Sequence, residues 1–159
     1  MKLILTIPFL LISLITYSQN SVVVWKKRIN ATVSAGVISI HNVKDRIVIN
    51  AVFQGSLLFA SKTYTSTSVS NIILVYDTSG VEKYALIIEG TNVNYYIKID
   101  NESNIIMYGT YGTLGGGYIK FKGNIINSIG VYDYFIAKID LQGNQQWIQP
   151  IISKNDQED

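Results

Sequence analysis

The sequence predicts an all-β fold on three observations. Apolar and polar residues alternate in several short segments, such as VISIH at 37–41, with the period of a half-buried strand. After residue 20, no stretch places apolar residues at the i, i+3, i+4, i+7 spacing of an amphipathic helix. The pattern of strands and turns also recurs after about sixty residues.

Each repeat unit is expected to contain four strands. In the first unit, about 30–88, these are residues 37–41, 46–53, 71–77 and 81–88, with a long Ser- and Thr-rich loop after the second. In the second unit, about 89–151, they are residues 96–100, 104–111, 134–140 and 144–151, with a Gly-rich loop in the same place. Residues 22–29 match only a fourth strand. Because β-propellers repeat four-stranded antiparallel sheets, we expect a partial β-propeller of about two such blades plus one extra strand.

Matching positions relate the two units. An offset of 59 residues places Ile38 on Ile97 in the first half of the unit. In the second half the offset becomes 63, and an insertion in the intervening loop accounts for the change. The repeated motif positions are Trp25, Asp77, Gly80, Tyr84, Asp140, Gly143 and Trp147.

The two Asp-x-x-Gly segments predict tight turns between the third and fourth strands. The carboxylates of Asp77 and Asp140 are expected to accept hydrogen bonds from backbone amides. Gly80 and Gly143 are expected to take the positive φ of a type I turn followed by a bulge. The aromatic residue on the fourth strand would then pack between neighbouring sheets.

Residues 133–147, DYFIAKIDLQGNQQW, resemble the SBBP-type β-propeller repeat of exported bacterial proteins, notably those of Bacteroidetes. The matching positions are Asp133, Phe135, Ala137, Lys138, Asp140, Gly143, Asn144 and Trp147. The earlier copy keeps Asp77 and Gly80 but is otherwise degenerate. The resemblance implies a propeller-type fold and export, and it brings no catalytic residues with it.

The N-terminus has the pattern of a secretory signal peptide, which we expect at residues 1–18. Lys2 precedes an apolar run over 3–15, and Thr16 and Ser18 place small residues at the −3 and −1 positions. The run is shorter than the roughly 20 residues of a membrane-spanning helix. We therefore expect a secreted or cell-envelope protein with no membrane span after cleavage. Its repeat region is 19–151, and a polar tail follows at 152–159.

Composition excludes several kinds of site. The chain has no Cys and one His, so thiolate sites and multi-histidine metal sites are excluded. Its formal net charge of +2, without a clustered basic face, argues against nucleic-acid binding. No cofactor or metal is expected.

No arrangement of residues predicts catalysis. His41 has Ser39 and Asp45 nearby, but no nucleophile elbow such as Gly-x-Ser-x-Gly occurs. Residues 100–104 alternate acidic and amide side chains as in a calcium loop, yet the loop lacks its central Gly and closing Glu, so a hairpin turn is favoured. Residues 115–117, three glycines, lack the Lys-Ser/Thr of a phosphate loop.

The sequence therefore predicts an exported, non-enzymatic β-propeller-repeat protein that acts as a structural or protein-interaction module, or is a piece of a larger propeller. An open pair of blades exposes edge strands, through which self-association or pairing with other propeller-repeat chains is expected. The alternative is an extracellular glycan- or ligand-binding module that uses loop Tyr and Asn residues. It requires Tyr95, Tyr111, Tyr118 and Tyr132 to converge on one exposed concave face.

Overall fold

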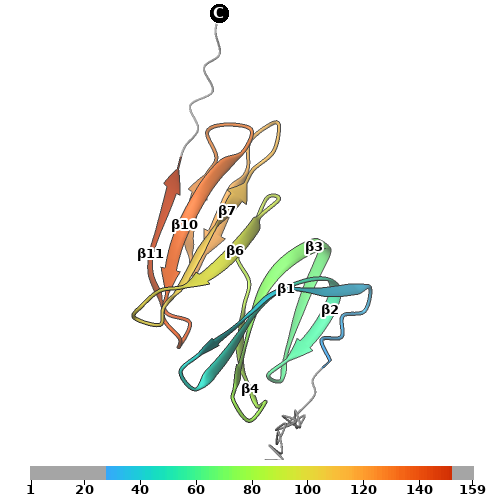
Figure 1. Cartoon of the computed structure of the whole chain (residues 1–159). Coiled ribbons are helices and arrows are strands. Elements are labelled where there is room, and N and C mark those ends of the chain that lie inside the picture. Colours follow the sequence, from blue (N-terminus) through green and yellow to red (C-terminus); the bar gives the residue numbers. More distant parts are fainter. Residues whose placement is uncertain (1–27, 152–159) are drawn as a thin grey trace, which may run out of the picture.

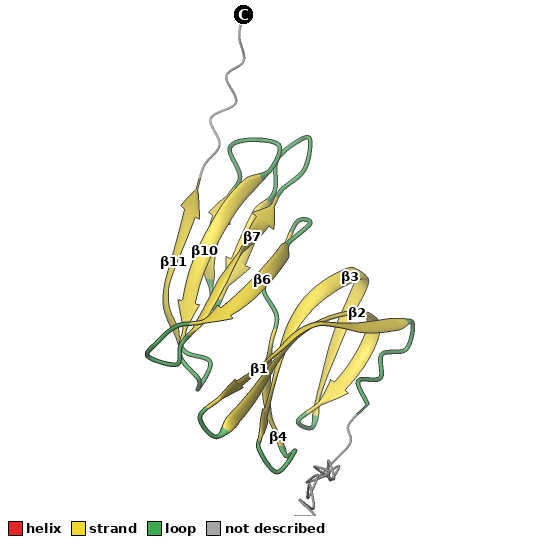
Figure 2. Cartoon of the chain, in the orientation of Figure 1, coloured by secondary structure: helices red, strands yellow, loops and turns green. Residues whose placement is uncertain are grey.

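Residues 28–151 are described by a computed structural model, and every regular element among them is a β-strand (Figure 2). The strands are β1 Ser34–Val43, β2 Arg46–Phe59, β3 Lys62–Asp77, β4 Glu82–Leu86, β5 Glu89–Gly90, β6 Asn94–Ile99, β7 Ile105–Tyr111, β8 Tyr118–Phe121, β9 Asn124–Asn127, β10 Asp133–Ile139 and β11 Gln145–Ile151. No helix that could span a membrane occurs in 28–151. The predicted signal peptide, Trp25, most of the predicted strand 22–29 and the tail lie outside the described residues.

The strands form three antiparallel sheets (Figure 1). The first sheet has the order β1-β2-β3-β4, and the second has the order β6-β7-β10-β11. A small third sheet, β5-β8-β9, is built mainly from the chain between β7 and β10. The all-β prediction is confirmed, and each of the eight strands expected within the two units has a counterpart in one of the four-stranded sheets.

The Ser- and Thr-rich run was expected to be a loop, and this prediction is wrong. It forms the far half of a long hairpin in which β2 and β3 stay paired as far as Phe59 and Lys62. The hairpin turns at Ala60 and Ser61, both of which have positive φ, where Asn-Gly would be the usual pair. The sequence therefore carries neither the turn signal nor an apolar face along β3. The Gly-rich loop likewise contains a short hairpin, β8–β9.

The tip of the long hairpin folds back over one face of the first sheet. The Tyr64 hydroxyl donates to the Ala85 carbonyl at 3.2 Å, and the Ala60 amide donates to the Glu82 carboxylate at 2.8 Å. The rings of Phe59 and Tyr76 meet edge to face with centroids 5.0 Å apart. This face is thereby buried as a separate core, with Ile49, Ala51, Phe53, Leu57, Phe59, Ile72, Leu74 and Tyr76.

The opposite face of the first sheet packs against the second sheet. Val48 and Val75 of the first sheet share one buried cluster with Met107 and Ala137 of the second. Ile119 of the small sheet completes the same cluster. Burial of these side chains is the main force that holds the two sheets together.

Two buried asparagines add direction to this apolar contact. Asn50 of β2 and Asn71 of β3 each donate a side-chain hydrogen bond to the Tyr95 carbonyl of β6, at 3.1 and 3.0 Å. Both side chains are buried, so these bonds fix where β6 lies across the first sheet.

Strand registers correct the alignment of the two units. Leu74 and Ala137 are equivalent under the offset of 63, and their partners Ile49 and Met107 differ by 58 residues. The offset of 59 predicted for the first half of the unit is therefore one residue too long at β2 and β7. The cause is turn length, because two residues join β1 to β2 whereas a wider turn joins β6 to β7.

Replacing Asn71 with Leu should lower the free energy of unfolding by about 1–3 kcal/mol, because the variant loses a buried hydrogen bond that joins the sheets. The exposed Asn127→Leu is the matched control and should change stability by less than about 0.5 kcal/mol. Urea unfolding followed by circular dichroism measures both. Equal effects in the two variants would contradict the assignment.

Candidate interaction surface

The β3–β4 turn has the geometry predicted for Asp77 and Gly80. The Asp77 carboxylate accepts hydrogen bonds from the amides of Ser79 and Val81, at 3.0 and 2.9 Å. Gly80 has φ +85° and donates its amide to the Asp77 carbonyl. The register shifts after Val75, as expected for a turn followed by a bulge.

Asp140 forms the same turn between β10 and β11. Its carboxylate accepts the amides of Gln142 and Asn144, at 2.9 and 2.8 Å. Gly143 has φ +82° and donates to the Asp140 carbonyl. The two predicted turns are therefore equivalent bond for bond.

A third copy of this turn joins β6 to β7. The Asp100 carboxylate accepts the amides of Glu102 and Asn104, at 2.9 and 2.7 Å. Ser103 stands where the other turns have Gly, and it adopts φ +72°. A hairpin turn was favoured here, but its identity with the Asp-x-x-Gly turns was missed because the glycine is replaced. The preceding Asp was the signal that could have identified it.

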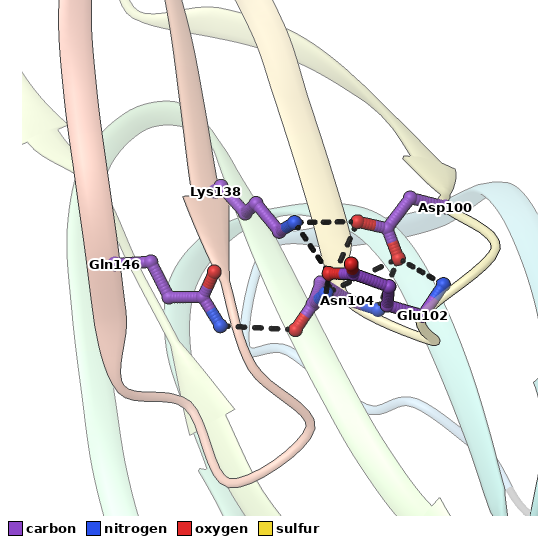
Figure 3. Close-up of polar contacts among 5 residues, drawn as sticks. All are labelled: Asp100, Glu102, Asn104, Lys138 and Gln146. Carbon is purple, nitrogen blue, oxygen red and sulfur yellow. Dashed lines mark hydrogen bonds and ion pairs between the residues drawn. The ribbon is translucent and has the colours of Figure 1, made fainter.

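The third turn anchors a polar cluster on the second sheet (Figure 3). Lys138 of β10 contacts the Asp100 carboxylate at 2.8 Å and the Glu102 carboxylate at 3.1 Å. Asn104 accepts a 3.0 Å hydrogen bond from the Gln146 side chain of β11. One turn is thereby linked to the two neighbouring strands of its sheet.

These contacts shift the pKa values of the turn carboxyls. The Lys83 ammonium, then Ser79 and Val81, hold the pKa of Asp77 well below its usual range. Lys138, helped by Asn104, does the same for Asp100. In return, Asp100 and Glu102 raise the pKa of Lys138. The ionised carboxylate is thus the form that the turns favour.

Tyr84 and Trp147 occupy equivalent positions in the two sheets but have different surroundings. The Tyr84 hydroxyl donates to the Leu141 carbonyl of the β10–β11 turn at 3.0 Å. Its ring lies over Gly143, where an added Cβ would be 2.9 Å from the ring. Tyr84 therefore packs between the sheets as expected, whereas Trp147 is 41% exposed.

The outward face of the second sheet, here called the outer face, carries the exposed aromatic residues. Tyr96 and Tyr108 are directly opposite each other across β6 and β7, with ring centroids 6.0 Å apart. Tyr108 is opposite Ile136, and Lys138 is opposite Trp147, so these side chains share one face. The large exposed apolar residues of this face are Tyr96, Tyr108, Tyr134, Trp147 and Ile151.

The four tyrosines predicted to bind a ligand do not form one exposed surface. Tyr95 and Tyr111 are buried, each edge to face with Phe135 at centroid distances of 6.4 and 6.3 Å. Tyr118 and Tyr132 are 41% and 52% exposed. Strand alternation explains the error, because Tyr95 points into the core and its neighbour Tyr96 points outward.

The first sheet offers a different hollow, on the side not covered by the hairpin tip. This groove of about 560 Å³ is mainly apolar. The chain enters it at Arg28 and Ile29, and Val37 and Ile40 of β1 line it with exposed side chains.

The residues weighed for catalysis have structural partners. The His41 ring is 3.1 Å from the Ser39 hydroxyl, and Asp45 pairs with Arg46. Asp133 is buried and accepts the Ile129 amide at 2.6 Å. Within 28–151, no cluster of three or more His, Asp or Glu side chains is arranged to hold a metal ion.

Comparisons with protein families, with curated proteins and with solved structures give no match for this chain.

Gly143→Ala should destabilise the protein by more than Gly123→Ala. Both glycines have positive φ, but an added Cβ at Gly143 meets the Tyr84 ring, whereas nothing lies within 4 Å of one at Gly123. The difference in unfolding free energy, expected to be about 1–3 kcal/mol, isolates the contact between the sheets. Equal losses would show that Tyr84 does not restrict the position.

The carboxyls with lowered pKa make stability depend on acid pH. In the unfolded chain these groups titrate near pH 4, as roughly expected for free Asp. Stability should therefore be constant from neutral pH to about pH 5 and fall as the pH drops below 4, because protonation removes the favoured carboxylate. Asp77→Asn should lower the melting temperature at pH 7 and lower it less at pH 3. The exposed Asp45→Asn serves as control, and a gap that widens in acid would contradict the assignment.

Proposed function

We propose that this chain is an exported, non-enzymatic β-propeller-repeat protein that acts as a structural or protein-interaction module. Support for propeller-type blades comes from two four-stranded sheets with the same meander order. The shared Asp-x-x-Gly turns and the registers related by 63 residues add to this support. Export is supported by the signal-peptide pattern at residues 1–18.

The observation that carries the interaction role is the outer face. Its central strands place Tyr108 and Tyr134 at the surface, 39% and 52% exposed, beside the half-buried Ile136. Contiguous exposed apolar surface of this kind marks a binding site more often than it occurs by chance. Tyrosine also suits interfaces, because its ring is apolar and its hydroxyl tolerates water.

A face is better suited to binding than the strand edges that the sequence suggested. The edge strand β4 has 5 residues, and the edge strand β11 contains Pro150, which has no amide to donate. The edge strand β1 carries a register shift between Val37 and Ser39. Short strands, proline and bulges all discourage strand addition.

The second candidate function is the binding of a glycan or another extracellular ligand. The exposed Tyr96–Tyr108 pair favours it, since two neighbouring aromatic rings offer a stacking surface. This places the site on strands of the outer face, and not on the tyrosines that the sequence suggested.

Site-specific photocrosslinking in cells that produce the chain naturally tests the interaction role. A photoreactive phenylalanine analogue at Tyr96 or Tyr134 should give discrete protein adducts in the exported fraction. The same analogue at Ile125, which is equally exposed on β9, should give none. Absence of adducts from the outer face, or equal adducts from Ile125, would contradict the proposal.

A further inference from the structure

The outer face corresponds by strand register to a face that is already covered within the chain. Under the offset of 63, Ile73 corresponds to Ile136, and Tyr84 to Trp147. Ile73 is fully buried because the second sheet packs on it, whereas Ile136 is only partly buried. The molecule therefore shows what covers such a face, and the cover is another β-sheet.

The other end of the molecule is closed by the chain itself. In the second sheet, Tyr84 of the neighbouring sheet lies against the β10–β11 turn. At the equivalent β3–β4 turn, the hairpin tip is present, with Ala60 bonded to Glu82. A second copy could not repeat the contact between the two sheets at this end without displacing the tip. Head-to-tail stacking is therefore disfavoured, and one outer face per chain remains open.

The charges of the outer face suit self-pairing. Lys98 and Lys138 project from it, and Asp100 and Glu102 lie at its turn, with Lys138 contacting both carboxylates. Two positive and two negative groups leave the face without net charge, so two copies do not repel each other. The apolar residues occupy its centre on β7 and β10.

We propose that the outer face binds the outer face of a second copy and forms a two-fold symmetric dimer. The inference rests on the proposed function and names its partner. Because each chain has one open face, pairing is closed and stops at two. Four strands of about seven residues present a face of roughly 20 Å by 23 Å. This is at the low end for stable interfaces, so the dimer should form in a concentration-dependent manner at about micromolar levels.

Light scattering coupled to size-exclusion chromatography tests this on the protein purified after export. Between about 1 and 100 μM, the mass should rise from one copy to two and remain there. Tyr108→Lys should weaken dimerisation at least tenfold, because two lysines then meet in an apolar contact. Tyr118→Lys is the matched control, since Tyr118 is equally exposed on β8, and it should leave the dimer intact. Circular dichroism melting checks that both variants fold.

Three results would overturn the inference. A wild-type monomer at 100 μM would do so, and the crosslinking result at Tyr96 and Tyr134 would then show separately whether the face binds a different protein. Oligomers larger than two that Ile40→Lys dissociates would indicate head-to-tail packing into the groove of the first sheet. A monomer retained on a polysaccharide matrix only while Tyr108 is present would assign the face to a glycan.

Discussion

Three aspartate carboxylates set the strand registers on which the rest of the structure depends. Asp77, Asp100 and Asp140 each bind two amides of the turn that follows them, so the number of residues between the paired strands is fixed. Register determines which side chains face which side of a sheet, and a slip of one residue exchanges the two faces. Tyr84 therefore points into the contact between the sheets, and Trp147 points to solvent.

The two four-stranded sheets share this framework but differ in how their second faces are treated. The first sheet buries its second face under the hairpin tip, using Leu57 and Phe59. The second sheet has no such extension, and its second face keeps Tyr96, Tyr108 and Tyr134 at the surface. The asymmetry arises from chain length between equivalent strands, since the first unit spends its additional residues on lengthening β2 and β3. The second unit spends them on the separate hairpin β8–β9.

Sequence analysis located the strands because burial on one or both faces leaves a clear apolar pattern. It also predicted the turns at Asp77 and Asp140, where side-chain chemistry is local. It missed features whose cause is not local. The hairpin turn at Ala60 and Ser61 forms with residues that seldom adopt positive φ, because the tip packs on distant residues. The binding surface was assigned to Tyr95, and not to its neighbour, because both faces of β6 carry tyrosine.

The inserted hairpin between β7 and β10 has a consequence for how this architecture can vary. Closing a longer loop costs only about 0.6 kcal/mol for each doubling of its length. β7 and β10 are held together along their whole length regardless of what joins them. Gly115 and Gly116 lie in open space within this connection, away from the outer face strands. New sequence could enter there at little energetic cost, which makes the connection the natural point at which related chains would acquire different surfaces on a common framework.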